Sequence, residues 1–176
     1  MSAHLSTFKS STALITGASS GIGKAYAQKL ASLGIHLILT ARSEQKLNDL
    51  ADELRKKYNV NVEVIVLDLA QSNSAQILFD EVQARKLSVE ILINNAGQAI
   101  SAPFLKTDMA LWQQMLNVNL TGSMLTMQAA LPDMQQAAWG RIINIASTAG
   151  QVGYAYVAAY SAAKHGVIGL TKSVAL

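Results

Sequence analysis

Tyr160 and Lys164 stand four residues apart near the end of the chain. On a helix, this spacing places both side chains on one face. Because an ammonium beside a phenol favours the phenolate, we expect Tyr160 to exchange a proton with a carbonyl or hydroxyl oxygen near neutral pH. Ser147 precedes the tyrosine by 13 residues, and its hydroxyl is expected to hydrogen-bond the same oxygen. Taken singly, each of the three residues is more often structural, so the interpretation rests on their joint placement.

A glycine-rich turn near the start of the chain has the pattern of a phosphate-binding loop. Residues 16–23 read TGASSGIG, between an apolar run and a helical pattern. Such a turn lets the backbone approach a pyrophosphate, to which the helix N-terminus offers N–H groups and a partial positive charge. The residues expected to contact it are Gly17, Ser19, Ser20, Gly21, Ile22 and Gly23. The alternative is a tight turn that only packs the helix against the strand.

The second apolar run ends in Ala41, followed by Arg42 and Ser43. Dinucleotide-binding proteins commonly carry Asp or Glu there, which bonds the adenosine ribose. A guanidinium binds a 2′-phosphate through paired donors, whereas a carboxylate would repel it. We therefore expect NADP(H) in preference to NAD(H), with Arg42 as the main discriminator and Ser43 beside it. The alternative is a surface arginine in an exposed turn.

These residues lie at the ends of alternating strand and helix patterns. Short apolar, β-rich runs predict strands over residues 12–16, 36–41, 61–68, 90–94 and 141–146. Helical spacing predicts helices over residues 21–33, 44–58, 72 or 74–85, 111–131 and 156–176. Ser43 is expected to cap the second helix, and Ser72 or Ser74 to start the third. The alternation predicts an α/β fold, with a parallel sheet covered by helices on both faces.

Composition narrows the classes of function. The 176 residues are 51% hydrophobic and contain no Cys, which suits one globular domain and excludes disulfides and thiolate metal sites. Charges of both signs gather in residues 42–90, a pattern typical of solvated helix faces and not of a nucleic-acid-binding stripe. Residues 109–132 carry no charge, but polar side chains interrupt them too often for a membrane span. We expect a cytoplasmic protein with neither nucleic acid nor membrane as partner.

Together these motifs resemble the short-chain dehydrogenase/reductase family in its classical form, over about Ser11–Leu176. The family's Asp after the third strand matches Asp68, and with Leu69 it is implied to contact the adenine. The family's Asn-Asn-Ala-Gly motif matches residues 94–97, which implies that Asn94, Ala96 and Gly97 lie beside the adenosine ribose and that the motif supports the sheet. Its catalytic tetrad matches Asn119, Ser147, Tyr160 and Lys164. The resemblance implies a Rossmann-type doubly wound sheet in the order 3-2-1-4-5.

The resemblance also implies the reaction, a hydride transfer between NADP(H) and a small carbonyl or secondary alcohol. Tyr160 is expected to protonate the oxygen and Ser147 to position it. Lys164 would hold the nicotinamide ribose, and Asn119 would anchor a water in a relay to Lys164; Tyr160 and Lys164 thus also contact the cofactor. The stretch from residue 140 onward resembles 3-oxoacyl reductases and 3-hydroxyacyl dehydrogenases. Two helices almost free of charge imply a homodimer or homotetramer.

Family members are longer, so residues 1–176 are expected to form a single dinucleotide-binding domain that lacks the family's last strands. Two other interpretations stay open. One is a non-catalytic or weakly active nucleotide-binding fragment. The other is an epimerase or dehydratase that uses the same tyrosine–lysine pair. The side chains between Ser147 and Tyr160, among them Gln151, Tyr154 and Tyr156, are expected to face the substrate.

Overall fold

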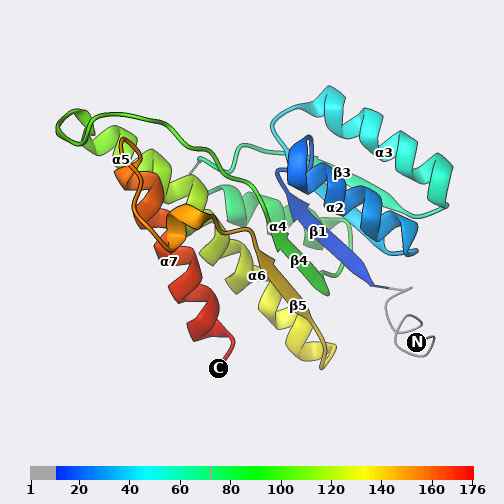
Figure 1. The fold of residues 1–176 in the computed structure, drawn as a ribbon. Coiled ribbons are helices and arrows are strands. Elements are labelled where there is room, and N and C mark those ends of the chain that lie inside the picture. The colour runs from blue at the N-terminus through cyan, green and yellow to red at the C-terminus, as the bar shows by residue number, and fades with distance from the viewer. Residues whose placement is uncertain (1–10, 72) are drawn as a thin grey trace.

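The computed structural model describes residues 11–71 and 73–176, which form a parallel sheet between two layers of helices (Figure 1). The strand order is β3-β2-β1-β4-β5, and each neighbouring pair is parallel. The strands are β1 Thr12–Thr16, β2 His36–Ala41, β3 Val62–Val66, β4 Ile91–Asn94 and β5 Arg141–Asn144. The predicted α/β class and strand order are therefore confirmed.

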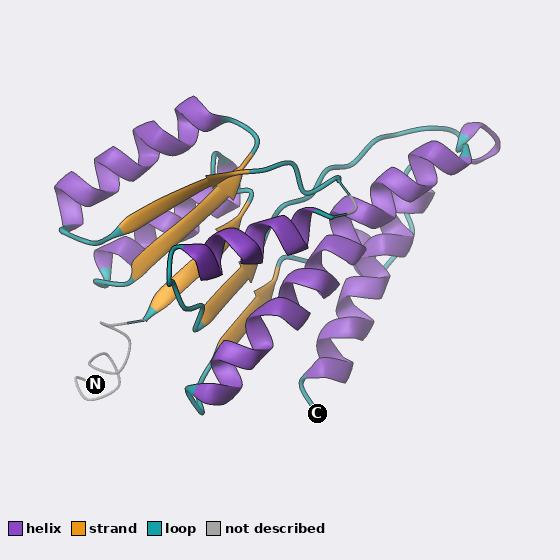
Figure 2. Ribbon diagram, turned by 180° about the vertical axis from the view of Figure 1, so that it is seen from behind, coloured by secondary structure: helices purple, strands orange, loops and turns teal. Residues whose placement is uncertain are grey.

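Helices cover both faces of this sheet, as Figures 1 and 2 show from opposite sides. Helices α2 and α3 pack on one face, and α4 and α6 on the other. Helix α7 packs against α5 and the turn η2. The helices are α2 Gly21–Ser32, α3 Glu44–Tyr58, α4 Ser74–Ala84, α5 Met109–Leu116, α6 Gly122–Gln136 and α7 Ala158–Val174, with the π turn η2 Asn117–Thr121 and the short 3₁₀ turns η1 Phe104–Lys106 and η3 Thr148–Gly150.

The core explains why the strands are nearly continuous apolar runs. In β1, Ala13 and Ile15 face α2 and α3, while Leu14 between them faces α4 and α6. All three are fully buried. Because side chains alternate across a strand, a sheet covered on both faces needs an apolar residue at every position.

The structure differs from the sequence-based prediction in the helix that was expected over residues 111–131. That segment is two helices, α5 and α6, joined by the π turn η2, and α6 continues through Pro132 to Gln136. A π turn inserts one extra residue without ending the helix, so the apolar pattern continues across it and does not reveal it.

The two serine predictions have different outcomes. Ser43 occupies the N-cap position of α3, but its hydroxyl makes no capping bond. Helix α4 begins at Ser74, which confirms one of the two expected starts, and Ser72 lies outside the described residues. The hydroxyl of Ser43 is therefore free of a capping role.

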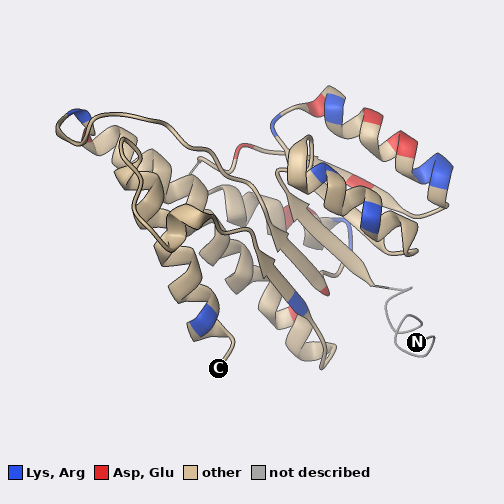
Figure 3. Cartoon of the chain, viewed as in Figure 1, with Lys and Arg blue, Asp and Glu red and all other residues tan. Residues whose placement is uncertain are grey.

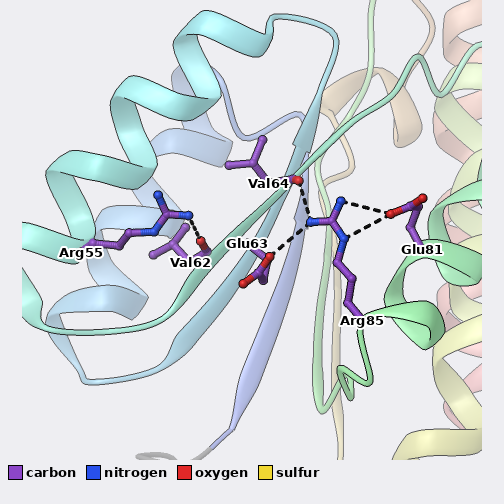
Figure 4. A network of polar contacts seen from close by, with 6 residues as sticks. All are labelled: Arg55, Val62, Glu63, Val64, Glu81 and Arg85. Atoms are coloured by element: carbon purple, nitrogen blue, oxygen red, sulfur yellow. Dashed lines mark hydrogen bonds and ion pairs between the residues drawn. The ribbon is translucent and has the colours of Figure 1, made fainter.

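Two arginines cover the outer edge of β3 (Figure 4). Arg55 donates to the carbonyl of Val62, and Arg85 donates to the carbonyl of Val64 at 3.1 Å while it pairs with Glu63 and Glu81. Arginine donors thus occupy carbonyls that an edge strand would otherwise leave open to another chain. Arg141 and Ile143 on β5, at the opposite edge, are exposed.

Charged residues gather in the part of the molecule around α2 and α3, whereas α5, α6 and α7 carry few charged residues (Figure 3). Among the described residues no helix has the length and apolarity that a membrane crossing requires. Nor do residues 11–71 and 73–176 hold a cluster of His, Cys, Asp and Glu that suits a metal ion.

Candidate active site

The glycine-rich turn joins β1 to α2 in a tight, backbone-mediated junction. Gly17 takes a left-handed conformation with φ +66°, which glycine adopts without strain. A Cβ on Gly23 would stand 2.4 Å from the carbonyl oxygen of Gly17, closer than any real contact. The side-chain amide of Asn95 donates to the carbonyls of Thr16 and Gly17 at 3.0 and 3.1 Å. These contacts press the start of α2 against the turn and fix where its first N–H groups point.

A cleft of about 550 Å³ opens above this turn, at the carboxyl ends of the strands. This is the edge at which doubly wound sheets bind their ligands. Most of the residues expected to bind the cofactor line it, namely Gly17, Ser19, Ser20, Gly21, Ile22, Arg42, Ser43, Asp68, Leu69, Ala96 and Gly97. Gly23 is buried beneath the turn and acts through packing.

Asn94 supports the sheet, as the motif implies, but it departs from its expected place beside the ribose. It is 4% exposed and does not line the cleft, whereas its neighbour Asn95 does. The amide of Asn94 donates to Asn144 on β5 at 2.9 Å and accepts from the hydroxyl of Thr126 on α6 at 2.7 Å. As the last residue of β4 it faces inward, so it ties the sheet to α6.

The cleft contains cationic groups that the sequence pattern only partly indicated. Arg55, Arg85 and Arg141 each contact a carbonyl, carboxylate or ring. Arg42 has no such partner among the described residues, and it is exposed at the cleft. Lys46, in the first turn of α3, lines the same end of the cleft.

Lys46 was not anticipated, and neither were Gln98, Gln114 and Val118, which also line the cleft. For Lys46 one signal was present in the sequence. Helix N-termini favour acidic residues because the helix dipole is positive there, so a lysine in the first turn, one turn after Arg42, is locally unfavourable.

Lys164 is buried inside α7, with 5% of its surface exposed. Its ammonium donates a hydrogen bond of 2.7 Å to the carbonyl of Ile145 and lies 5.8 Å from the centroid of the Tyr160 ring. Burial lowers the pKa of Lys164, because the charged form loses hydration. The amine therefore releases its proton more readily than an exposed lysine would.

Asn119 lies in the π turn η2 and is 1% exposed. Its amide nitrogen donates to the carbonyls of Gln98 and Met115 at 2.9 and 3.0 Å, and its Oδ1 accepts from the N–H of Gln98 at 3.3 Å. Both N–H donors of the Asn119 side chain are therefore already hydrogen-bonded to backbone carbonyls. Asn119 fixes the backbone that follows β4 against the helix that carries the π turn.

Gly97 links Lys164 and Asn119 to the cleft. It lines the cleft, and a Cβ placed on it would stand 2.7 Å from Oδ1 of Asn119 and 3.6 Å from Nζ of Lys164. Both polar atoms thus lie at the end of the cleft where the chain leaves β4. A side chain at position 97 would collide with Asn119, so the glycine keeps this end open.

Ser147 lies just before η3, in the loop between β5 and α7. Its Oγ accepts from the N–H of Ala149 at 3.2 Å. A Cβ on Gly150 would stand 2.7 Å from the carbonyl oxygen of Lys164, so η3 packs directly against α7. Tyr160, the third residue of α7, is half-buried. The fold therefore brings together the elements that carry Ser147, Tyr160, Lys164 and Asn119. None of these four residues lines the cleft itself, including Tyr160 and Lys164, which were expected to contact the cofactor.

Comparison with known proteins agrees with this geometry. A family model for short chain dehydrogenases matches residues 11–176. A 3-oxoacyl-(acyl-carrier-protein) reductase of Aquifex aeolicus (strain VF5) is 38% identical over 162 residues, which are 92% of this chain and 65% of that protein. A D-beta-hydroxybutyrate dehydrogenase of Rhizobium meliloti (strain 1021) is 36% identical over 94% of this chain and 64% of its own length.

Solved structures give the same result. A metagenomic short-chain oxidoreductase in complex with NADP superposes with a TM-score of 0.87 at 38% identity, over 93% of this chain and 74% of that one. The chain thus spans about 65% of the length of the first curated relative that it matches. On its fold, its motifs and these matches, the chain belongs to the short-chain dehydrogenase/reductase family, a family of oxidoreductases.

Proposed function

We propose that the protein transfers a hydride between NADP(H) and a small carbonyl or secondary alcohol. One observation carries the proposal. The buried ammonium of Lys164 lies near the ring of Tyr160 and also at the end of the cleft marked by Gly97. A proton-transfer pair near a cleft that opens over the glycine turn suits chemistry at a nicotinamide.

The cleft fits the cofactor by its donors as well as by its place. The turn at Gly17 leaves backbone open to a pyrophosphate at the start of α2. Asp68 and Leu69 line the part of the cleft that follows β3 and would flank the adenine. Arg42, the free hydroxyl of Ser43 and the ammonium of Lys46 surround one corner, where a 2′-phosphate would meet two cations and a hydroxyl donor. This corner supports NADP(H) over NAD(H).

When bound, the nicotinamide supplies or accepts the hydride at the substrate carbon. Tyr160 donates the proton that converts the carbonyl oxygen into a hydroxyl, and Ser147 donates a hydrogen bond that orients that oxygen. Lys164 would hold the ribose of the cofactor and would return a proton to Tyr160, and its burial favours release of that proton. Asn119 acts as a positioning residue, because it holds the backbone of Gln98 beside Gly97.

The names of two relatives describe a 3-oxoacyl reductase and a hydroxybutyrate dehydrogenase, which supports a carbonyl compound or a secondary alcohol as the substrate. The helices α5, α6 and α7 carry few charged residues (Figure 3), which supports a homodimer or homotetramer. We place the protein in the cytoplasm. A non-catalytic or weakly active nucleotide-binding protein is the second candidate, favoured by the fact that Ser147, Tyr160, Lys164 and Asn119 do not themselves line the cleft.

The test is consumption of NADPH, followed by absorbance, with a panel of ketones and 3-oxoacyl thioesters. Tyr160→Phe should lower kcat by about 10²–10⁴-fold, with a far smaller change in the dissociation constant for NADPH. Tyr58→Phe, at the far end of α3, serves as the control and should match the wild type. NADPH binding without turnover by the wild type would favour the second candidate, and turnover by Tyr160→Phe at the wild-type rate would overturn the proposal.

A further inference from the structure

Gln114 presents a polar side chain to the cleft that no described residue uses. It lies in the last turn of α5, is exposed, and lines the cleft together with Val118. The neighbouring Gln113 differs, because its Nε2 donates to Oδ1 of Asn117 at 2.7 Å. Four residues beyond Gln114 stands Val118, which offers no polar side-chain atom. Within residues 11–71 and 73–176 the side-chain amide of Gln114 therefore has no hydrogen-bond partner, and it is available to a ligand.

The helix that carries Gln114 passes close to the segment that follows β3. A Cβ placed on Gly122 would stand 3.8 Å from the carbonyl oxygen of Leu69. Val118 and Gln114 precede Gly122 by one and two turns, so the three positions follow one side of α5 and η2. Leu69, Val118 and Gln114 all line the cleft. This wall of the cleft therefore begins beside Leu69 and reaches Gln114 two turns away.

The other walls of the cleft indicate which part of the proposed cofactor this wall would meet. The glycine turn would bind the pyrophosphate, and Arg42 with Lys46 would bind the 2′-phosphate. The adenosine ribose joins those two groups, so the base would extend from it along the segment that contains Asp68 and Leu69. The edge of adenine farthest from its sugar carries N1 and the 6-amino group. That edge would face the wall that ends at Gln114.

A glutamine amide matches this edge of adenine because it carries a donor and an acceptor. In DNA complexes glutamine binds the N6/N7 edge of adenine through two hydrogen bonds, and N1 is an equivalent acceptor on the other side of the 6-amino group. Asp68 alone would not satisfy this edge, because a carboxylate has no proton to donate to N1. One of its oxygens, Oδ1, already accepts from the N–H of Ala70 at 3.0 Å. The cleft therefore needs a donor at this place, and the amide of Gln114 supplies one.

We propose that Gln114 is a specificity-determining residue that recognises the adenine of the cofactor, with its oxygen accepting from the 6-amino group and its NH₂ donating to N1. Val118, one turn further along the same wall, packs against the base. The inference rests on the proposed function, because it takes NADP(H) as the ligand, and it deepens that function by assigning the residue that selects the base. A nucleotide with N1 and the 6-amino group blocked is the disfavoured ligand.

Three substitutions separate hydrogen bonding from other effects. Gln114→Leu removes both polar groups and keeps a side chain that packs. Gln114→Glu keeps an acceptor for the 6-amino group but loses the donor to N1. Gln113→Leu is the matched control, because it changes the same residue type in the same helix at a position that does not line the cleft. Both positions are exposed, so all three variants should fold like the wild type.

The readout is equilibrium binding, which requires no turnover. Calorimetry gives the dissociation constants of NADP and of its 1,N6-etheno derivative, in which a two-carbon bridge occupies N1 and the 6-amino group. The wild type should bind NADP more tightly than the derivative. Gln114→Leu should lower this preference about three- to tenfold, the scale of a lost hydrogen bond, because NADP binds more weakly and the derivative does not. Gln114→Glu should give an intermediate preference, since its added charge repels both ligands alike, and Gln113→Leu should keep the wild-type preference.

Adenosine 2′,5′-bisphosphate, which has the base and the 2′-phosphate but no nicotinamide, is a second ligand. Gln114→Leu should weaken its binding by the same factor as that of NADP. The same preference for NADP over its derivative in the wild type and in Gln114→Leu would overturn the inference, as would an equal loss in Gln113→Leu.

The outcomes also separate this inference from the proposed function. Binding of NADP that depends on Gln114, without turnover of any carbonyl substrate, would overturn the proposed hydride transfer and support the role of Gln114. Turnover with NADPH and a preference that Gln114→Leu leaves unchanged would do the reverse. Failure of the wild type to bind NADP would overturn both.

Discussion

The ammonium of Lys164 and the carbonyl of Ile145 form a buried hydrogen bond of 2.7 Å that joins α7 to the residue just after β5. A buried charge is costly unless polar groups surround it. One carbonyl satisfies one of its three N–H donors, and the others are available to partners at the cleft. Lys164 thus holds the catalytic helix to the sheet and also keeps donors for a ligand.

The burial of Lys164 leads to a prediction about how the free energy of unfolding depends on pH. Burial lowers the pKa of Lys164, so the folded protein releases this proton at a lower pH than the unfolded chain, whose lysine keeps its ordinary value of 10.5. Between those two values the unfolded state binds more protons, and the free energy of unfolding rises with pH. Lys164→Met lacks this contribution. Urea unfolding at a series of pH values up to about 10.5 should show the wild type gaining stability relative to the variant.

A constant difference between wild type and Lys164→Met across that range would contradict the role of burial. Lys172→Met, an exposed change in the last turn of the same helix, should show no such trend. Activity adds a second readout, since Lys164→Met should lose turnover while it remains folded.

Cofactor choice should depend on the cationic corner of the cleft. Arg42→Asp should lower the preference for NADPH over NADH by about 10–100-fold, the scale of one lost charge-assisted hydrogen bond. Lys46→Gln should lower it several-fold, because its charge is exposed and screened. The measurement is the ratio of the two dissociation constants from cofactor fluorescence. Lys56→Gln, near the other end of α3, should leave the ratio unchanged; an unchanged ratio in Arg42→Asp would remove the basis for NADP preference.

The glycine turn should not tolerate a methyl group at position 23. Gly23→Ala places a Cβ 2.4 Å from the carbonyl oxygen of Gly17 and 2.5 Å from the amide nitrogen of Asn95. We expect a loss of about 1–3 kcal/mol in the free energy of unfolding, as in overpacked cores, and weaker NADPH binding. Gly169→Ala in α7 meets nothing within 4 Å and should stabilise the protein by about 0.5–1 kcal/mol. Equal effects of the two substitutions on stability would refute the packing argument.

Asn119 should matter for stability as well as for turnover. Asn119→Ala removes three hydrogen bonds to the backbone of Gln98 and Met115 at a buried position, which should cost about 2–4 kcal/mol. Gln113→Ala removes one exposed bond to Asn117 and should cost less than about 0.5 kcal/mol. Denaturant unfolding measures both. If Asn119→Ala keeps wild-type stability, these bonds do not hold the segment after β4.

Sequence patterns were sufficient for the fold because the central strands β1, β2 and β4 are buried on both faces. Runs such as residues 12–16 admit few polar positions, so their apolar character marks each strand. The glycine motif was equally readable, since Gly17 and Gly23 have no substitute at their contacts. Strand ends were less certain: β3 is Val62–Val66, shorter than the expected 61–68, because pairing with β2 decides where the ladder stops.

The sequence did not show how helices sit over the cleft. Lys46 reaches it only through the placement of α3, and Gln114 and Val118 only through that of α5 and η2. Asn94 and Asn95 are adjacent, and a strand sends neighbouring side chains to opposite sides. Which asparagine faced the cleft therefore depended on where β4 ended.

The π turn at Asn117–Thr121 makes this site sensitive to chain length as well as to residue type. Each residue of a helix turns the chain by about 100°. Deleting one residue between α5 and α6 would restore regular winding, but it would rotate the apolar side of α6 away from the sheet or carry the amide of Asn119 away from Gln98. The extra residue is therefore a spacer, which lets α6 pack on the sheet while Asn119 contacts Gln98. An in-frame deletion of one residue there should destabilise the protein more than most point substitutions nearby.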